Sequence, residues 1–274
     1  MQLTVLGCRA GMPADGQPSS GYLVETGGSR VLLDCGPGIA TALTADRDPA
    51  GLDAVIISHL HIDHCYDLLP LGKILLAPYA LAKYPGFESW FENLPDRMPL
   101  IPLYVPVGAR SVLENLASAL TTESLPILDR VFEAAFDIRE YQPDDTVTIG
   151  DNTCEFIALP HAKPNCGLRI CGPDGSLAYS GDTGVSVALE RLAAGVDLFL
   201  CEASLEHTDR SAHGHLCAAD AARAATAAGA RELLLTHMPT GDEVWLKARL
   251  DEAVQLFPGR VRLAYPGMVH KIGR

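Results

Sequence analysis

The feature that most constrains this chain is a run of metal-binding side chains early in the sequence, His59-Leu60-His61-Ile62-Asp63-His64. The apolar segment before it, residues 53–58, is typical of a strand buried on both faces of a sheet. An isolated histidine after a strand is usually an ordinary hydrogen-bonded side chain. Three histidines and one aspartate in so short a run would leave several polar groups unpaired if they were buried without an ion. The run therefore predicts a metal site at the end of a strand.

The spacing within the run indicates two ions. In an extended segment His59 and His61 point in the same direction, so both can hold one ion. Asp63 and His64 lie about one helical turn further along the chain and face a second ion.

Three later side chains, His161, Asp182 and His237, each come shortly after an apolar segment that predicts a strand. Because open sheets place their sites at the carboxyl ends of strands, we expect these residues to meet the early run. Imidazole and carboxylate are ligands of zinc and of harder divalent ions, and the set lacks the thiolates of a structural zinc site. The single carboxylate of Asp182 can bridge two ions about 3.5–4 Å apart.

Strand-like and helix-like segments recur along the chain. We predict strands at residues 3–6, 21–25, 30–34, 53–58, 102–105, 146–149, 153–159, 176–180, 196–201 and 232–236. We predict helices at residues 68–76, 110–120, 217–228 and 242–257. This order favours a single domain over residues 1–274, of the α/β (α+β) class, in which two sheets pack face to face with helices outside.

Residues 77–100 show no clear periodicity. They contain several prolines and the bulky side chains Tyr79, Tyr84, Phe87, Trp90 and Phe91. A loop of that length in a compact domain is usually functional or mobile. We interpret it as a lid over the site, and the alternative is a surface excursion that packs its own aromatic side chains.

The composition restricts the function further. The net charge of −13 argues against stable binding of nucleic acid, yet bound cations would reverse the local field at a site for phosphodiesters. We find no apolar run of the length that a membrane span needs and no signal peptide, so we expect a cytoplasmic protein without a membrane partner. The eight scattered cysteines are expected to be reduced, mostly buried thiols, and Cys65 and Cys201 lie beside proposed metal residues.

The run from His59 to His64 matches the H-x-H-x-D-H signature of the metallo-β-lactamase superfamily, and His161, Asp182 and His237 follow in that superfamily's order. The resemblance covers essentially the whole chain. It implies a four-layer αβ/βα sandwich with a two-metal site at the sheet edge, and it is compatible with a homodimer. It also implies that seven residues bind the metals: His59, His61, Asp63, His64, His161, Asp182 and His237.

The surroundings of Glu202 and His215 in the sequence are similar to those found in the ribonuclease Z branch and its small phosphodiesterase relatives. In that branch a glutamate and a histidine form a pair beside the metals, and Glu202 and His215 stand in the corresponding contexts. An imidazole oriented by a carboxylate can protonate the alkoxide that phosphodiester hydrolysis expels. The resemblance thus implies catalytic roles for His215, Glu202 and Asp63. His213 competes for the role of proton donor, His215 could instead cap the following helix, and we expect His207 and His270 at the surface.

The chain also departs from ribonuclease Z. That enzyme usually carries a basic arm between the third histidine motif and the bridging aspartate, and here His161 and Asp182 are too close for one. We therefore favour a small phosphodiester substrate, with cyclic nucleotides first, hydrolysed by a metal-bridging hydroxide. The alternatives are an acyl hydrolase (thioesterase, glyoxalase II-like or lactonase), an RNA-processing nuclease, and an accessory protein of low activity. Zinc is the default for both ions, with manganese or iron as alternatives.

Overall fold

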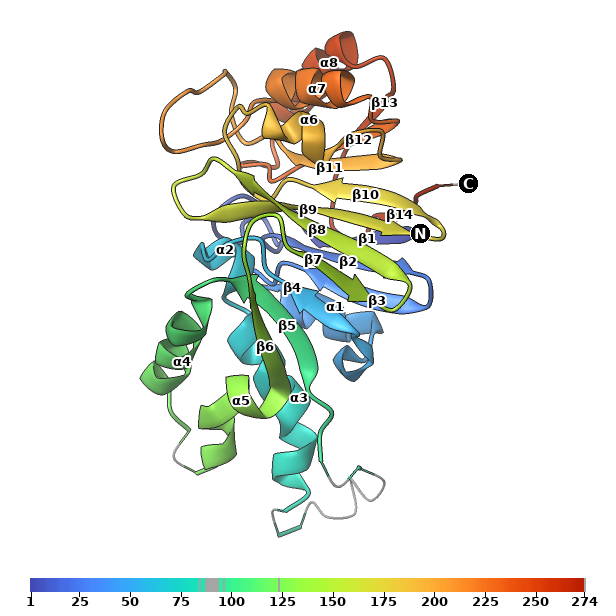
Figure 1. Cartoon of the computed structure of the whole chain (residues 1–274). Helices are drawn as coiled ribbons and strands as arrows, with labels where there is room; N and C mark the ends of the chain where they lie inside the picture. Colours follow the sequence, from blue (N-terminus) through green and yellow to red (C-terminus); the bar gives the residue numbers. More distant parts are fainter. Residues whose placement is uncertain (84, 87–93, 96, 123, 274) are drawn as a thin grey trace.

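Two β-sheets packed face to face form the centre of the molecule, and helices cover both outer faces (Figure 1). The computed structural model describes residues 1–83, 85–86, 94–95, 97–122 and 124–273. Among these residues the first sheet contains, in spatial order, β14 (Val269–Lys271), β1 (Gln2–Gly7), β2 (Gly21–Thr26), β3 (Ser29–Leu33), β4 (Ala54–Ile56), β5 (Ile101–Pro106) and β6 (Phe136–Tyr141). The second contains β13 (Arg260–Leu263), β12 (Glu232–Thr236), β11 (Leu198–Glu202), β10 (Gly175–Tyr179), β9 (Asn165–Gly172), β8 (Asn152–Leu159) and β7 (Thr146–Ile149).

The helices are divided between the two outer faces (Figure 1). Those of the first half of the chain are α1 (Ile39–Asp46), α2 (Ile62–Cys65), α3 (Leu68–Leu81), α4 (Ala109–Ala119) and α5 (Val131–Ala135), with 3₁₀ turns at Pro49–Gly51 and Pro126–Arg130. Those of the second half are α6 (Ala188–Leu192), α7 (Ala218–Ala228) and α8 (Glu243–Leu256). The predicted αβ/βα sandwich is confirmed. In the described ranges, no helix has the length and apolar character that a membrane span requires.

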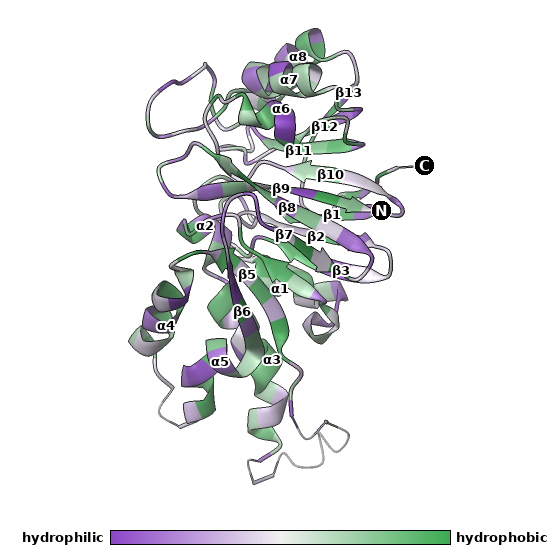
Figure 2. Cartoon of the chain, viewed as in Figure 1, coloured by the Kyte–Doolittle hydropathy of each residue, from purple (hydrophilic) through white to green (hydrophobic). Residues whose placement is uncertain are grey.

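Three apolar layers hold the sandwich together. One lies between the first sheet and helices α1, α3, α4 and α5, and another lies between the second sheet and α6, α7 and α8. The third lies between the sheets, where the rings of Tyr22 and Tyr179 are 5.1 Å apart at their centroids. Figure 2 shows hydrophobic residues along the inner strands and along α3, and hydrophilic residues on the outer surface of α4 and α8. Burial of this apolar surface from water is the main driving force for the layering.

The strand directions bring several chain segments to one edge of the sandwich. β3, β4 and β5 are parallel in the first sheet, and β10, β11 and β12 are parallel in the second. β8 is antiparallel to β9, which is antiparallel to β10, so β8 and β10 also end at the same edge. The residues after β4, β8, β10, β11 and β12 therefore meet there, as expected for carboxyl ends of strands.

The structure corrects two expectations. Residues 77–81 are not irregular, because α3 continues to Leu81 with Pro78 inside it, and the buried side chains of Leu76 and Ala80 show that packing sustains the extra turn. Much of the proposed lid, including residues 84, 87–93 and 96, lies outside the described residues, so the lid stays a prediction. His270 is not at the surface: it is buried on β14, where its imidazole lies 3.4 Å from the carboxylate of Glu232.

Candidate metal centre and active site

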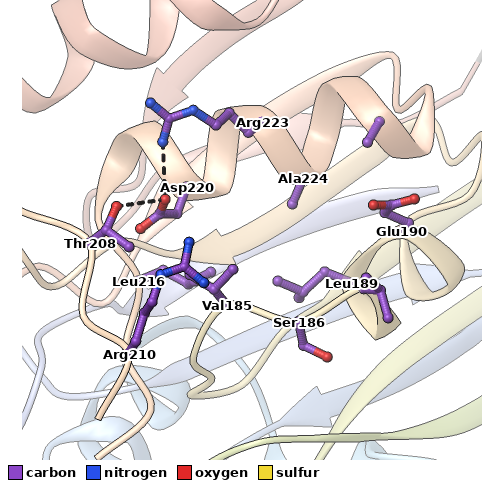
Figure 3. Close-up of a pocket in the computed structure, with 12 residues that line it drawn as sticks. Val185, Ser186, Leu189, Glu190, Thr208, Arg210, Leu216, Asp220, Arg223 and Ala224 are labelled. Carbon is purple, nitrogen blue, oxygen red and sulfur yellow. Dashed lines mark hydrogen bonds and ion pairs between the residues drawn. The ribbon is translucent and has the colours of Figure 1, made fainter.

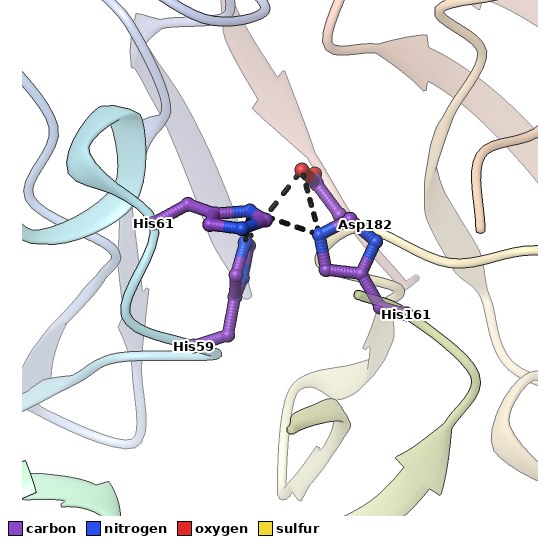
Figure 4. A group of neighbouring side chains, drawn as sticks. All are labelled: His59, His61, His161 and Asp182. Carbon is purple, nitrogen blue, oxygen red and sulfur yellow. Dashed lines mark hydrogen bonds and ion pairs between the residues drawn. The ribbon is translucent and has the colours of Figure 1, made fainter. Parts of the chain in front are cut away.

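A first group of ligand atoms lies where β4, β8 and β10 end, and Figure 4 shows its four side chains converging. The Nδ1 atom of His61 is 3.0 Å from Nε2 of His59 and 2.9 Å from Nε2 of His161. The Oδ2 atom of Asp182 lies 3.6 Å from Nε2 of His59 and 3.8 Å from Nε2 of His161. These four atoms can surround a single ion.

A second group lies beside the first and shares Asp182 with it. The Oδ1 atom of Asp182 lies 3.2 Å from Nε2 of His64 and 3.4 Å from Nε2 of His237. The Oδ2 atom of Asp63 is 3.1 Å from Nε2 of His237. Because Asp182 turns one oxygen to each group, its carboxylate has the placement of a bridge between two ions.

The local backbone explains why one short run serves both groups. The chain is still extended at His61, which precedes the first turn of α2. Asp63 and His64 belong to that helical turn, so their side chains leave in another direction. The structure therefore brings together all seven residues named from the sequence, and it divides the early run between the two groups as the spacing predicts.

Hydrogen bonds on the outer nitrogens fix how three of the imidazoles are presented. Nδ1 of His161 donates to the carbonyl oxygen of Gly214 at 2.9 Å, and Nδ1 of His59 lies 3.1 Å from the hydroxyl of Ser58. Nδ1 of His64 lies 2.6 Å from Oδ2 of Asp34. A histidine whose Nδ1 donates a hydrogen bond turns the lone pair of Nε2 toward the site, which is the usual arrangement around a metal.

Asp34 is the residue that this arrangement depends on and that sequence reasoning missed. Besides His64, its carboxylate accepts hydrogen bonds from the backbone and the hydroxyl of Ser58, at 2.7 and 2.9 Å, and from the hydroxyl of Tyr179 at 2.6 Å. Asp34 thus orients His64 directly and His59 through Ser58. An aspartate at the end of a strand, two residues before Gly36, is typical of a turn, so only its place at a strand end could have suggested this role.

The loop after β1 also reaches the site. The backbone N–H of Gly11 donates to Oδ2 of Asp63 at 2.8 Å. The hydroxyl of Ser19 donates to the carbonyl oxygen of the same glycine at 2.8 Å. The loop after β1 therefore contacts a proposed ligand.

The residues present fit a pair of cations. Oδ1 of Asp182 is buried and accepts no hydrogen bond within the described part of the chain. Nδ1 of His61 carries at most one proton, so only one of its two short contacts to imidazole nitrogens can be a hydrogen bond. The other contact leaves an Nε2 atom without a proton donor, and a cation held by the three nitrogens would use all of their lone pairs.

The electrostatics agree with cation binding. Burial and the neighbouring imidazole of His64 hold the pKa of His59 well below its usual value, so this histidine is neutral and able to bind a metal. Burial opposes protonation of His64, but Asp182 and Asp34 together raise its pKa well above the usual value. A metal ion competes with that proton for Nε2.

Glu202, at the end of β11, and His215, in the loop before α7, form a pair beside the second group. Nδ1 of His215 is 2.9 Å from Oε1 of Glu202, which also accepts the N–H of Thr183 at 2.7 Å. The hydroxyl of Ser204 donates to Oε2 of Glu202 at 2.6 Å. Glu202 is fully buried, whereas a quarter of the His215 side chain, 24%, is exposed.

The neighbouring carboxylates, Glu202 first, set the charge of His215. Burial lowers the pKa of His215, but the hydrogen bond to Glu202 and the negative charges of Glu202, Asp182 and Asp63 raise it to about 9. Its ring centroid lies 5.0 Å from that of His161 and 5.8 Å from that of His237. The structure thus places His215 beside both groups, whereas His213 and His207 are exposed.

The comparisons with known proteins agree with the geometry. The model of the β-lactamase superfamily domain matches residues 29–238. The uncharacterised protein Rv1339 of Mycobacterium tuberculosis is 37% identical over 243 residues, which are 87% of this chain and 81% of that protein. Ribonuclease Z of Brevibacillus brevis is 27% identical and spans 94% of this chain and 93% of its own length.

The probable metallo-hydrolase YhfI of Bacillus subtilis is similar in both sequence and structure. Its sequence is 30% identical over 98% of this chain and 99% of its own length. Its crystal structure superposes with a TM-score of 0.80 and covers 98% of both chains, with 27% identity. The chain therefore belongs to the metallo-β-lactamase superfamily.

Proposed function

We propose that this protein is a two-metal phosphodiesterase that hydrolyses small phosphodiesters, with cyclic nucleotides as the first class to test. The observation that carries the proposal is the pair of Glu202 and His215 beside the two ligand groups. Phosphodiester hydrolysis breaks a P–O bond and leaves an alkoxide, which needs a proton far more than the leaving group of a thioester does.

The proposed division of labour follows from the contacts. Two divalent ions, zinc by default, would supply a nucleophile from water and offset negative charge on the phosphate. His59, His61, His161 and Asp182 would hold one ion, and Asp63, His64, His237 and Asp182 would hold the other.

His215 then acts as the general acid. Because Nδ1 of His215 faces Glu202, Nε2 is the nitrogen that can give a proton to the leaving oxygen. Glu202 keeps the ring in that orientation and favours its charged form before the proton is transferred.

Two observations support a small substrate. β9 and β10, which separate His161 from Asp182, are joined by a tight turn at residues 173–174, so no arm extends from this part of the chain. The net charge of −13 also disfavours a long polyanion. The relative named ribonuclease Z supports cleavage of a phosphodiester, although its name refers to RNA.

The test is a substrate panel with zinc-, manganese- and iron-loaded protein. It compares adenosine and guanosine 3′,5′-cyclic monophosphates and bis(p-nitrophenyl) phosphate with acyl-thioesters, lactones and a precursor transfer RNA. We expect turnover of the small phosphodiesters. Turnover confined to thioesters or lactones would instead establish an acyl hydrolase, and turnover confined to RNA a nuclease. Tight ligand binding without turnover of any compound would favour an accessory protein.

A further inference from the structure

The loop after β1, residues 8–20, fixes one ligand of the second group, Asp63, at two points. The backbone N–H of Gly11 donates to Oδ2 of Asp63 at 2.8 Å. The backbone N–H of Ser20 donates to the carbonyl oxygen of Asp63 at 3.1 Å. Of the hydrogen bonds that the structure describes for this loop, none reaches an imidazole of the first group. The loop therefore serves the second group selectively.

The same loop also holds the backbone next to His237, another ligand of the second group. His237 has a φ of 59°, in the left-handed region that side-chain-bearing residues rarely adopt. The N–H of Met238 donates to the carbonyl oxygen of Cys8, and the N–H of Ala10 donates to the carbonyl oxygen of Met238, both at 3.1 Å. A strained conformation persists only where its surroundings determine it. The position of the His237 imidazole thus depends on where this loop lies.

Arg9 ties the start of the loop to its tip. The tip, residues 14–17, is a two-residue turn in which Asp15 and Gly16 have φ values of 54° and 71°, as in a type I′ turn. The guanidinium group of Arg9 forms an ion pair with the carboxylate of Asp15. The side chain of Arg9 is buried, at 2% exposure, whereas that of Asp15 is 69% exposed. A buried cation thus holds an exposed turn in place.

This ion pair packs on the segment that follows His237. A Cβ atom added to Gly241 would lie 3.0 Å from Nη2 of Arg9 and 3.4 Å from Oδ2 of Asp15. Nε of Arg9 is buried and has no hydrogen-bond partner, and Asp15 is the only ion-pair partner of Arg9 among the described residues. Since a buried charge with one partner depends strongly on that partner, loss of either member would release the loop from this segment.

We infer that Arg9 is a positioning residue for the second ion. Its ion pair with Asp15 keeps the loop after β1 against the segment that follows β12. The loop then fixes two ligands of that ion, Asp63 and His237. The inference rests on the two-metal site of the proposed function, but it does not depend on the substrate. It means that loss of the ion pair weakens one ion and spares the other.

The test measures the binding of zinc alone, by titration against a competing chelator. Asp15→Gly removes the carboxylate, and glycine adopts a φ of 54° without strain. Arg9→Met removes the guanidinium group and keeps a long apolar side chain. Each substitution should weaken one of the two zinc ions by about tenfold and leave the other unchanged. Asp15→Asn should lose less affinity, because its amide oxygen still accepts a hydrogen bond from Arg9.

A His61→Ala background identifies the ion that is affected. His61 belongs only to the first group, so this variant keeps all four proposed ligands of the second. Addition of Asp15→Gly should weaken zinc binding in this background by about tenfold. Cobalt(II) bound in this background has visible absorption bands that depend on ligand number and geometry, and Asp15→Gly should shift them. A general loss of fold stability would not change these bands.

Asp144→Gly is the matched control. Asp144 also has a left-handed backbone, with a φ of 70°, and an exposed side chain, at 67%, that pairs with Arg191 at 2.7 Å. The substitution therefore changes the charge and the backbone freedom in the same way as Asp15→Gly. Within the described ranges, Asp144 forms no hydrogen bond or ion pair with a proposed ligand. We expect wild-type affinity for both zinc ions.

A second control removes the exposed member of another ion pair that is buried on one side. Figure 3 shows this pair, Arg223 and Asp220, beside the hollow between α6 and α7. The two groups are 3.1 Å apart, and their side chains are 60% and 7% exposed. Of the described residues that line this hollow, none is a proposed ligand. Arg223→Ala should therefore bind both zinc ions as the wild type does.

Thermal melting of the metal-free proteins shows which variants are folded, and Asp15→Gly, at an exposed tip, decides the outcome if Arg9→Met does not fold. Equal weakening of both ions, wild-type affinity for both, or the same selective loss in either control would overturn the inference. Binding of fewer than two zinc ions by the wild type would overturn it together with the two-metal site. If the selective loss is found and no small phosphodiester is hydrolysed, the proposed function fails and this inference stands.

Discussion

The carboxylate of Asp34 lies 2.6 Å from Nδ1 of His64 and connects, through the hydroxyl of Ser58, to Nδ1 of His59. One buried side chain therefore orients a proposed ligand of each ion. Asp34 thus links the two ligand groups, although it is a member of neither.

The first prediction concerns Asp34→Asn. Asparagine tolerates the left-handed backbone at this position, where φ is 56°, but its amide cannot accept all the hydrogen bonds that the carboxylate accepts. We expect the affinity for both ions to fall by about 10–100-fold, measured by titration against a competing chelator. Tyr179→Phe removes only one donor to Asp34 and should have a smaller effect. Unchanged affinity for both ions in Asp34→Asn would contradict this role.

The second prediction separates the two candidate proton donors. His215→Ala should lower kcat on a cyclic nucleotide by about 10²–10⁴-fold, because the leaving oxygen loses its acid, while metal content measured by elemental analysis stays the same. His213→Ala is the control, since His213 is exposed and is not part of the cluster of Glu202 and His215. A larger loss in His213→Ala than in His215→Ala would reverse the assignment.

The third prediction concerns pH. His215 must be protonated to act as an acid, so kcat should be full below its pKa and fall as pH rises through it. Glu202 raises that pKa, to about 9 in its present surroundings, against the lowering effect of burial. Glu202→Gln removes the raising charge and keeps the burial, so the alkaline fall in kcat should move to lower pH. A pH–rate profile whose alkaline limb stays in place would argue against Glu202 as the residue that sets the charge of His215.

The fourth prediction uses two glycines with the same backbone conformation. Gly214 has a φ of 68°, and a Cβ atom there would lie 2.6 Å from the carbonyl oxygen of Pro160. Gly195 has a φ of 62° and open space around it. Gly195→Ala should lower stability by about 1 kcal/mol through backbone strain alone and keep activity. Gly214→Ala should also displace the loop from His161, so kcat and the affinity for the first ion should both fall.

Thermal melting first shows whether both variants are folded. If both are folded and the two substitutions affect activity equally, the close approach of Gly214 to His161 is unimportant. The comparison thus separates the local role of the loop from a general effect on the fold.

Much of the fold could be predicted because strands buried on both faces leave continuous apolar runs. The strands at residues 146–149 and 232–236 lie where the sequence predicts them. β6 and β9 were not predicted, since charged residues such as Arg139 and Arg169 interrupt their patterns and find partners only in the folded chain. The helix across Pro78 also depends on tertiary packing, which outweighs a local preference.

The candidate site, like the fold, could be predicted only in part. Ligand types and spacing predicted how the early run divides between the two groups, and the resemblance to the superfamily supplied the full set of seven residues. Sequence alone could not choose between His213 and His215, whose difference depends on how the loop turns. Nor could it show the N–H of Gly11 at Asp63, since a backbone donor leaves no trace in residue identity.

The division of the proposed ligands between the two sheets has a consequence for biosynthesis. Each ion would take two side chains from the early run and two from the second half of the chain, with Asp182 counted for both. A ribosome-bound chain therefore has two of the four ligands for each ion until His161 has been made; the first set is complete once Asp182 has been added, and the second once His237 has been added. Full coordination of the second ion must then wait for more of the polypeptide than that of the first, and the order of the codons sets the order in which the two sites become complete.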